Sequence, residues 1–367
     1  MPGDNDWPDK SRPIEEPVYE PIGARALNEP AGENEDGAPR GPQIARAVLG
    51  QALDAGLRSV QSGRFWALTA AALLGSVCCG LVLAIVVVTG GDLPPEALTW
   101  AYILTAASLI VVSCVLAVRW TVYPSAALKG AEQDEGPGAT AAGPLLDWAA
   151  ASGGGVTFAA VTGVFLLVLA YLSKSPPALA GVAAAVILFE FLVFAAIGAG
   201  ASSWLNRTAG RFLAWTAAIT LLVGNVMAVV ALLPAVRSYE RVVVAINIER
   251  DEYGRAVSWE CLPESRGLAE VYHTERTVWL AAGNPLVIFA LLAGQTDPRE
   301  DSLAWLPGEL QNAAEGSQVP CVEGQEREAT GAELPLAAAG VALQLGVAGA
   351  FLGGGQFAFG RRSGSDG

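Results

Sequence analysis

The chain has 367 residues and a formal net charge of −14, and 52% of its residues are hydrophobic whereas only 16% are charged. Soluble domains carry about 25% charged residues, so this composition excludes a single water-soluble globule. The acidic balance also excludes nucleic acid as a partner, because no basic surface is available to displace counterions from phosphates. The sequence therefore predicts a membrane protein whose main partner is the lipid bilayer.

The N-terminal part of the chain divides into two segments. Residues 1–43 are rich in acidic residues and proline. They bury too little apolar surface to offset the entropy of ordering, so we expect a disordered acidic cytoplasmic tail. Residues 44–61 repeat apolar side chains at helical spacing, with Arg46, Asp54 and Arg58 on the other face. This pattern favours an amphipathic helix lying at the membrane interface; the alternative is a helix that simply continues into the first span.

Six apolar segments are long enough to cross about 30 Å of hydrocarbon at 1.5 Å per residue. We expect these transmembrane helices at residues 66–88, 97–118, 156–172, 177–199, 212–236 and 334–360. A further apolar segment, residues 278–294, contains Gly283, Asn284 and Pro285 at its middle. Asn-Pro favours the start of a new turn or helix, so this segment is interpreted as a strand followed by a short buried helix.

Basic residues in short loops indicate the orientation of the spans, because they resist translocation. One side of the membrane collects Arg46, Arg58, Arg64, Arg119, Lys129, Arg207, Arg211, Arg361 and Arg362. The short loops on the other side hold only Lys174. We therefore expect a multi-pass plasma-membrane protein with both termini in the cytoplasm, including a tail at residues 361–367. Residues 119–155 then form a cytoplasmic loop, which is glycine-rich and interpreted as largely flexible.

Residues 237–333 are expected to form a small α+β extracytoplasmic domain between the fifth and sixth spans. Alternating apolar residues at 242–248 and 257–261 predict a β-hairpin. Residues 285–292 and 306–312 predict short helices. The predicted fold class is therefore an all-α polytopic membrane protein with six transmembrane helices and this one small domain.

The five cysteines provide an independent indication of topology. Only Cys261 and Cys321 lie outside the expected spans, and both fall in the domain assigned to the oxidising side. A disulfide between them would close a loop of about 60 residues, worth roughly 4 kcal/mol. The alternative is a pair of thiol metal ligands, but with His273 the only histidine a zinc site would also need carboxylates. The acidic cluster of Asp297, Glu300 and Asp301 is interpreted as solvated surface, so we expect no metal and no cofactor.

Three polar side chains lie deep in the expected spans: Glu190, Asn225 and Gln344. An ionisable residue at the membrane centre is a functional hypothesis by default. One interpretation makes Glu190 a proton or cation carrier. The other makes it a neutral acid that hydrogen-bonds Asn225 and holds helices together. The structural interpretation is preferred, because no second charged residue lies deep in any span to form a relay.

The last span carries small residues at a spacing of four, which predicts close packing of two helix backbones. This stripe consists of Ala338, Ala342, Gly346, Ala350 and Gly354.

The sequence contains no HExxH, no GxSG and no P-loop motif, so we expect no enzyme and no catalytic residue. The first functional hypothesis is a scaffold or interaction protein of the cell envelope, which binds a membrane or envelope protein through its outer domain. A second is a transport permease: the layout of an interfacial helix, six spans and a disulfide-containing region before the last span resembles that of ABC-2-type permeases. That resemblance implies a separate ATPase subunit. A third is a proton-linked carrier centred on Glu190.

Overall fold

The computed structural model describes residues 50, 57–58, 60–88, 97–123, 143–250, 256–296, 305–315, 321–322, 325–326 and 335–363. All of them belong to one compact unit, residues 46–367. The expected tail and most of the expected interfacial helix lie outside the described residues. Within the described ranges the chain is mostly helical, and six helical segments are long and apolar enough to cross a membrane. The protein is therefore a multi-pass membrane protein.

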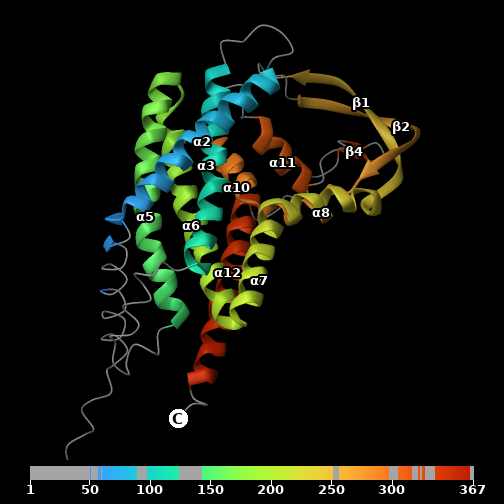
Figure 1. The fold of residues 1–367 in the computed structure, drawn as a ribbon. Coiled ribbons are helices and arrows are strands. Elements are labelled where there is room, and N and C mark those ends of the chain that lie inside the picture. The colour runs from blue at the N-terminus through green and yellow to red at the C-terminus, as the bar shows by residue number, and fades with distance from the viewer. Residues whose placement is uncertain are drawn as a thin grey trace, which may run out of the picture. The chain divides into compact units, whose positions relative to one another are not determined.

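Each of the six segments overlaps one of the predicted spans. Five are continuous helices: α2 (Gly63–Val88), α3 (Ala97–Val122), α5 (Gly143–Ser173), α6 (Pro177–Trp204) and α12 (Leu336–Ser363). The fifth apolar segment is composite and consists of α7 (Arg207–Ile219), the π-helical turn η3 (Thr220–Gly224), α8 (Asn225–Leu232) and the 3-10 turn η4 (Leu233–Val236). The C-terminal end of α12 and the connection between α6 and α7 lie at the same end of the bundle (Figure 1). This agrees with an even number of crossings between them.

The centre of the bundle is α6, which packs against α3, α5, α7 and α12. Its large side chains Phe191, Phe194 and Ile197 are fully buried. Glycines let the neighbouring helices approach closely. A Cβ atom at Gly355 of α12 would lie 2.6 Å from the backbone oxygen of Gly200 in α6, so no larger residue fits there without a shift. Backbone contact of this kind is how helices associate in lipid.

The third span is longer than predicted and begins at Gly143. Residues 153–155, which the sequence analysis assigned to a flexible loop, lie inside α5, so that part of the interpretation is wrong. The reason is tertiary packing. A Cβ atom at Gly155 would collide with the Phe191 ring, so this glycine serves close helix contact instead of flexibility. The Trp148 indole nitrogen also donates to the Leu192 backbone oxygen at 3.0 Å, which binds the extended start of α5 to α6.

The predicted hairpin is confirmed. Strands β1 (Arg237–Arg250) and β2 (Ala256–Tyr272) pair antiparallel, with irregularities in the register that mark β-bulges. Two short strands, β3 (Cys321–Val322) and β4 (Gln325–Glu326), extend the sheet in the order β2-β1-β3-β4. The hairpin lies toward the end of the bundle opposite the C-terminus (Figure 1).

The segment after the hairpin contains a correction. It forms the 3-10 turn η5 (Thr274–Arg276) and the helices α9 (Val278–Ala282), α10 (Pro285–Ala293) and α11 (Trp305–Glu315). The strand predicted at the start of residues 278–294 is therefore wrong, whereas the two short helices are confirmed. Phe289 and Ala293 of α10 belong to the same buried core as α3 and α6. A segment packed among helices has no strand to pair with, so its backbone must satisfy its own hydrogen bonds.

Candidate functional site

Asn284 links the break between α9 and α10 to the fifth apolar segment. Its side-chain oxygen accepts from the Leu286 backbone N–H at 2.9 Å and caps α10. Its side-chain nitrogen donates to the backbone oxygens of Leu222, at 2.8 Å, and Leu221, at 3.3 Å. The same nitrogen lies 3.1 Å from the side-chain oxygen of Asn225. Asn284 is only 2% exposed, and both polar atoms of its side chain are hydrogen-bonded.

These contacts fall on the π-helical turn η3. A π turn removes backbone carbonyls from their usual partners, and a buried carbonyl without a donor is costly. The chain changes direction between α7 and α8 (Figure 1), as helices commonly do at a π-bulge. Because Asn284 supplies donors to this turn from another part of the chain, the bend in the fifth segment and the break between α9 and α10 stabilise each other.

Gln344 binds the other side of the same break. Its side-chain nitrogen donates to the Gly283 backbone oxygen at 3.0 Å, and the residue is fully buried. Gln344 stands eight residues after the start of α12 at Leu336, about 12 Å along the helix at 1.5 Å per residue. Because a carbonyl oxygen only accepts, the amide nitrogen must face Gly283. The Oε1 atom of Gln344 is then left without a donor.

Glu190 lies at the middle of α6 and is fully buried. The Gln344 side chain is close enough to interact with the Glu190 carboxyl group, and so is the buried thiol of Cys114. No hydrogen bond of good geometry from the described residues, however, reaches either carboxyl oxygen. Three buried oxygen atoms, two from Glu190 and one from Gln344, therefore lie in this region without a donor. A buried carboxylate in such surroundings is costly unless it is protonated, paired with a cation or reached by water.

We refer to Glu190, Gln344, Gly283, Asn284 and Asn225 as the buried polar cluster. The sequence analysis singled out Glu190, Gln344 and Asn225 but expected Glu190 to hydrogen-bond Asn225. That pairing is wrong: Asn225 accepts from Asn284, and neither the Asn225 side-chain nitrogen nor the Glu190 carboxyl forms a hydrogen bond of good geometry with a described residue. The roles of Gly283 and Asn284 were missed. The Gly-Asn-Pro sequence inside an apolar segment was the available signal, and the sequence analysis used it only as a boundary.

The small-residue stripe of α12 faces away from the described helices along most of its length. Ala338, Ala342, Gly346 and Ala350 are exposed, and a Cβ atom at Gly346 would meet nothing within 4 Å. Gly354 alone approaches another helix, at the Trp204 ring. The close contacts of α12 instead come from a different face. That face contains Gly340, Gln344, Ala348 and Gly355.

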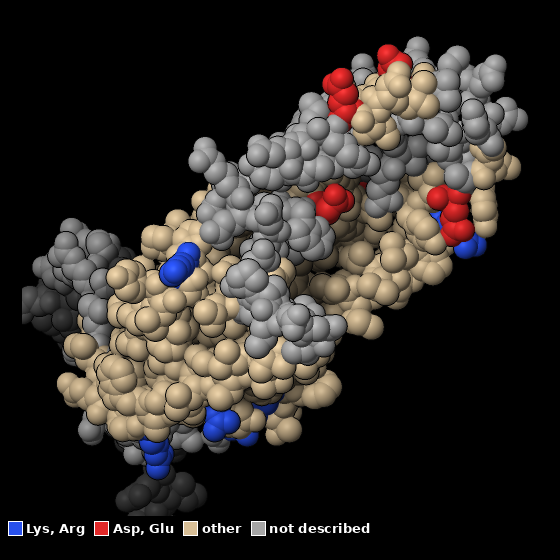
Figure 2. Space-filling view, turned by 90° about the horizontal axis from the view of Figure 1, so that it is seen from above, with Lys and Arg blue, Asp and Glu red and all other residues tan. Residues whose placement is uncertain are grey.

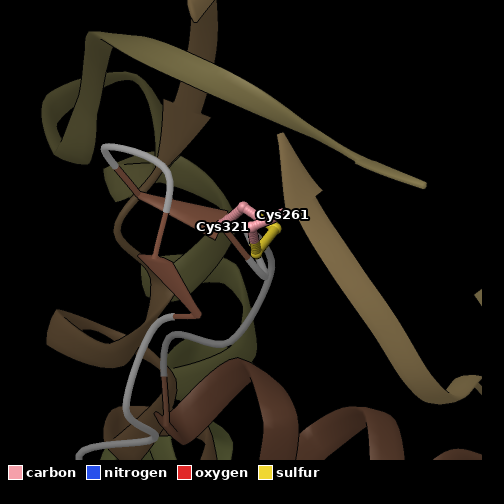
Figure 3. The surroundings of a disulfide bond; sticks show 2 residues. All are labelled: Cys261 and Cys321. Carbon is pink, nitrogen blue, oxygen red and sulfur yellow. A yellow bond between two sulfur atoms is a disulfide. The ribbon is translucent and has the colours of Figure 1, made fainter. Parts of the chain in front are cut away.

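Cys261 and Cys321 form a disulfide, as predicted (Figure 3). Their Cα atoms are 5.6 Å apart, and the bond joins β2 to β3 across 60 residues of sequence. Cys321 is fully buried. The bond therefore holds the short strands against the long hairpin. Because both thiols are used in this bond, the alternative of two thiol metal ligands does not apply.

The remaining candidate residues fall into two groups. Asp297, Glu300 and Asp301 lie outside the described residues, and in the ranges that are described no three His, Cys, Asp or Glu side chains gather as metal ligands. His273 is half-buried and hydrogen-bonded to Ser238 and Glu275. In the view from above (Figure 2), the described acidic side chains gather on one side of the molecule, and most of the described basic side chains lie on the other side.

No protein-family model matches this chain, and neither a characterised protein nor a solved structure is significantly similar to it. The six apolar segments place the chain in the class of integral multi-pass membrane proteins, and within that class the buried polar cluster is the feature that bears on function.

Proposed function

We propose that this chain is a plasma-membrane carrier that binds and releases a proton at Glu190 while it moves a second solute. The observation that supports the proposal is the Glu190 carboxyl group, buried among helices with neither oxygen hydrogen-bonded by the described residues. A carboxyl that served only to hold helices together would be bonded to its neighbours. This observation favours the carrier interpretation over the structural one that was preferred from the sequence.

A proton on Glu190 changes the local hydrogen-bond balance. The neutral acid turns one of the three acceptor oxygens into a donor, and its O–H group can donate to Gln344 Oε1. Loss of the proton leaves a carboxylate in apolar surroundings, which costs several kcal/mol unless water enters or the helices rearrange. The two protonation states therefore favour different arrangements around Glu190, which is the property a proton-linked carrier requires.

The break between α9 and α10 supplies an element that can respond. Interrupted helices are tolerated at membrane depth where they are buried in protein or line a cavity, and in transporters they form binding sites. Here α9 has only five residues, and Gln344 binds the Gly283 carbonyl at its end. Gln344 thus connects the Glu190 carboxyl to the break.

In this proposal both termini are cytoplasmic, and the β1–β2 hairpin lies in an extracytoplasmic compartment. Arg119 lies in the last turn of α3, and Arg361 and Arg362 lie in the last turn of α12, which supports a cytoplasmic location for these helix ends. The disulfide supports an oxidising location for the hairpin, since such bonds persist outside the cytoplasm.

The hairpin supports a second candidate function, the binding of an envelope protein. Among the described strands β2 is at the sheet edge, and Leu268 on it is 70% exposed. Edge strands offer unpaired backbone groups to a partner. A third candidate, a permease with a separate ATPase subunit, is distinguished by its need for ATP. A carrier works with a pH gradient alone.

The test uses dicyclohexylcarbodiimide, which adds to protonated carboxyl groups in apolar surroundings. Purified full-length protein in lipid vesicles is labelled over a pH series, and the modified residue is identified by mass spectrometry. We expect modification of Glu190 that decreases as the pH rises, and no modification at this position in Glu190→Gln.

The control is Glu309→Gln, which changes an exposed carboxyl on α11 and should leave the labelling unchanged. Labelling of Glu190 that does not change with pH would show a permanently neutral structural acid and would contradict the proposal. Protection by Na⁺ at constant pH would replace the proton with a sodium ion.

A further inference from the structure

The base of the hairpin brings a serine and the single histidine of the chain onto one face. Ser238 is paired with Val271 in the β1–β2 register, and directly opposed residues point to the same side of a sheet. The backbone N–H of His273 donates to the Val236 oxygen at 2.9 Å, which continues the pairing beyond β2. Because side chains alternate along an extended strand, His273, two positions after Val271, lies on the face of Ser238.

Ser238, His273 and Glu275 form a hydrogen-bonded chain. The Ser238 Oγ atom lies 2.9 Å from His273 Nε2, and His273 Nδ1 lies 2.9 Å from Glu275 Oε1. A carboxylate only accepts, so Nδ1 of the neutral imidazole carries the hydrogen and donates to Glu275. The Nε2 atom is then the acceptor, and the Ser238 hydroxyl donates to it. This is the order of contacts that activates a serine nucleophile.

Glu275 is held in place by the turn that carries it. The Thr274 hydroxyl donates to the Ala313 backbone oxygen in α11 at 2.9 Å. The Arg276 backbone N–H donates to the His273 oxygen at 3.2 Å. The side chains of His273 and Glu275 are 13% and 27% exposed, so both are partly shielded from water. Anchoring of this kind limits the movement of the carboxylate relative to the imidazole.

The chain of contacts lies where the apolar segments end. Ser238 comes two residues after η4, which closes the fifth apolar segment. Three residues after Glu275, Val278 starts α9, which packs against α8 and α12. The hydroxyl therefore lies directly after an apolar segment long enough to cross a membrane, and the histidine and carboxylate lie just before a short helix that packs against that segment. Substrates dissolved in the membrane surface can reach this position more readily than large soluble ones.

We propose that Ser238 is a nucleophile activated by His273 and positioned by Glu275, and that it accepts acyl groups from carboxylic esters at the membrane surface. The proposal does not depend on Glu190 or on the carrier function. It also goes against the expectation, drawn from the absence of sequence motifs, that the chain is not an enzyme. Ser238 and His273 are 35 residues apart in the sequence, so no local motif could predict that they are in contact.

The reaction needs only ester and water. The Ser238 oxygen attacks the ester carbonyl carbon while His273 Nε2 takes the hydroxyl proton. The bond between the carbonyl carbon and the alcohol oxygen then breaks, and the alcohol leaves with the proton from His273. Water attacks the acyl-serine, gives one proton to His273, and releases the acid as the Ser238 oxygen recovers its proton.

The same hairpin provides a matched control. The Ser258 hydroxyl donates directly to the Glu249 carboxylate at 2.9 Å, so this contact involves no histidine. Ser258 is also exposed, so a probe reaches it easily. A reagent that modifies serines by accessibility alone would label Ser258. A reagent that requires an activated hydroxyl would label Ser238.

The experiment treats the full-length protein in lipid vesicles with an alkyl fluorophosphonate, and mass spectrometry identifies the modified serine. We expect labelling of Ser238, none at this position in Ser238→Ala, and unchanged labelling in Ser258→Ala. His273→Gln should slow the reaction by about 10²- to 10⁴-fold, the usual contribution of a general base. No labelling of Ser238, or equal rates with and without His273, would overturn the proposal.

A purely structural role for the three residues is separated by two further measurements. Glu275→Gln should slow labelling and Glu275→Asp should restore it, because a carboxylate can only accept and so fixes the hydrogen on Nδ1, whereas an amide can also donate. Each variant is also checked for its disulfide and its melting temperature. If labelling follows the melting temperature through the series instead of the presence of the carboxylate, Glu275 has no positioning role and the proposal fails.

Discussion

Two carboxyl groups, Glu190 in the helix bundle and Glu270 at the base of the hairpin, have opposite surroundings. Glu270 is exposed, yet its Oε1 atom accepts from the Tyr272 hydroxyl at 2.6 Å and from the Arg237 guanidinium at 3.0 Å. Glu190 is fully buried and neither oxygen is bonded by the described residues. Hydrogen-bond partners are therefore present at Glu270, which water could solvate, and missing at Glu190, which is buried away from water. The difference supports the proposed role of Glu190 as a carrier of a proton or an ion.

Asn284 sharpens this comparison, because it is also buried among helices but is fully hydrogen-bonded. The bundle can therefore satisfy a polar side chain where the fold depends on it. If Asn284 is structural and Glu190 functional, substitutions at the two positions should affect stability in opposite ways.

The largest effect is expected for Asn284→Ala. The substitution removes the cap of α10 and leaves the carbonyl oxygens of Leu221 and Leu222 without this donor. Each buried group that loses its partner costs about 1–3 kcal/mol, so we expect a loss of about 3 kcal/mol or more. Thermal unfolding in detergent measures it. Asn206→Ala is the control, since Asn206 caps α7 at an exposed position and should cost only about 1 kcal/mol.

The next effect is expected for Gly340→Ala, which tests the packed face of α12. Its Cβ atom would meet the Ala282 carbonyl group, so the helices must separate, at a cost of about 1–3 kcal/mol. Gly346→Ala on the exposed stripe should change the unfolding free energy by no more than about 0.5 kcal/mol, since nothing lies within 4 Å of that position. Equal losses in thermal unfolding for both variants would show that the stripe is packed as well.

A smaller effect of opposite sign is expected for Glu190→Gln. The amide has the same shape, cannot ionise, and supplies a donor where three acceptors lack one. We expect the free energy of unfolding to stay the same or to rise by up to about 1 kcal/mol, which is the contribution of a typical buried hydrogen bond. The melting temperature of the variant should also vary less between neutral and alkaline pH than that of the wild type. A clear loss of stability would restore the structural interpretation of Glu190.

The smallest effect is expected at Glu270. The Tyr272 hydroxyl and the Arg237 guanidinium lower the pKa of this carboxyl below its usual value. A group whose pKa is lowered by folding stabilises the fold above its ordinary pKa, about 4.3, and this stabilisation is lost as the pH falls through the folded-state pKa. Amide exchange at the hairpin base should therefore be faster in Glu270→Gln than in the wild type at pH 7, and the two should converge in acid. Because the pair is exposed, the difference is small.

The sequence alone predicted the positions of the six apolar helices, the hairpin and the disulfide. These features depend on local signals: runs of apolar residues long enough for a bilayer, a period of two, and the placement of cysteines outside the spans. The failures share a different cause. Three predictions failed: residues 278–282 form a helix, residues 153–155 lie inside α5, and the stripe at Ala342 and Gly346 faces outward. In each case the outcome depends on the neighbouring segment against which the residues pack, and the local sequence does not contain that information.

The sequence by itself determined that this chain has six segments long and apolar enough to cross a membrane and that Glu190, Asn225 and Gln344 lie within them, because hydrophobic length is a property of contiguous residues. The tertiary structure decided their partners. Asn284 donates to a carbonyl of the π turn, Gln344 donates to Gly283, and no hydrogen bond of good geometry from a described residue reaches Glu190. Hydrogen bonds between helices depend on distance and direction across 60 or more residues of chain, and no local pattern in a sequence records them.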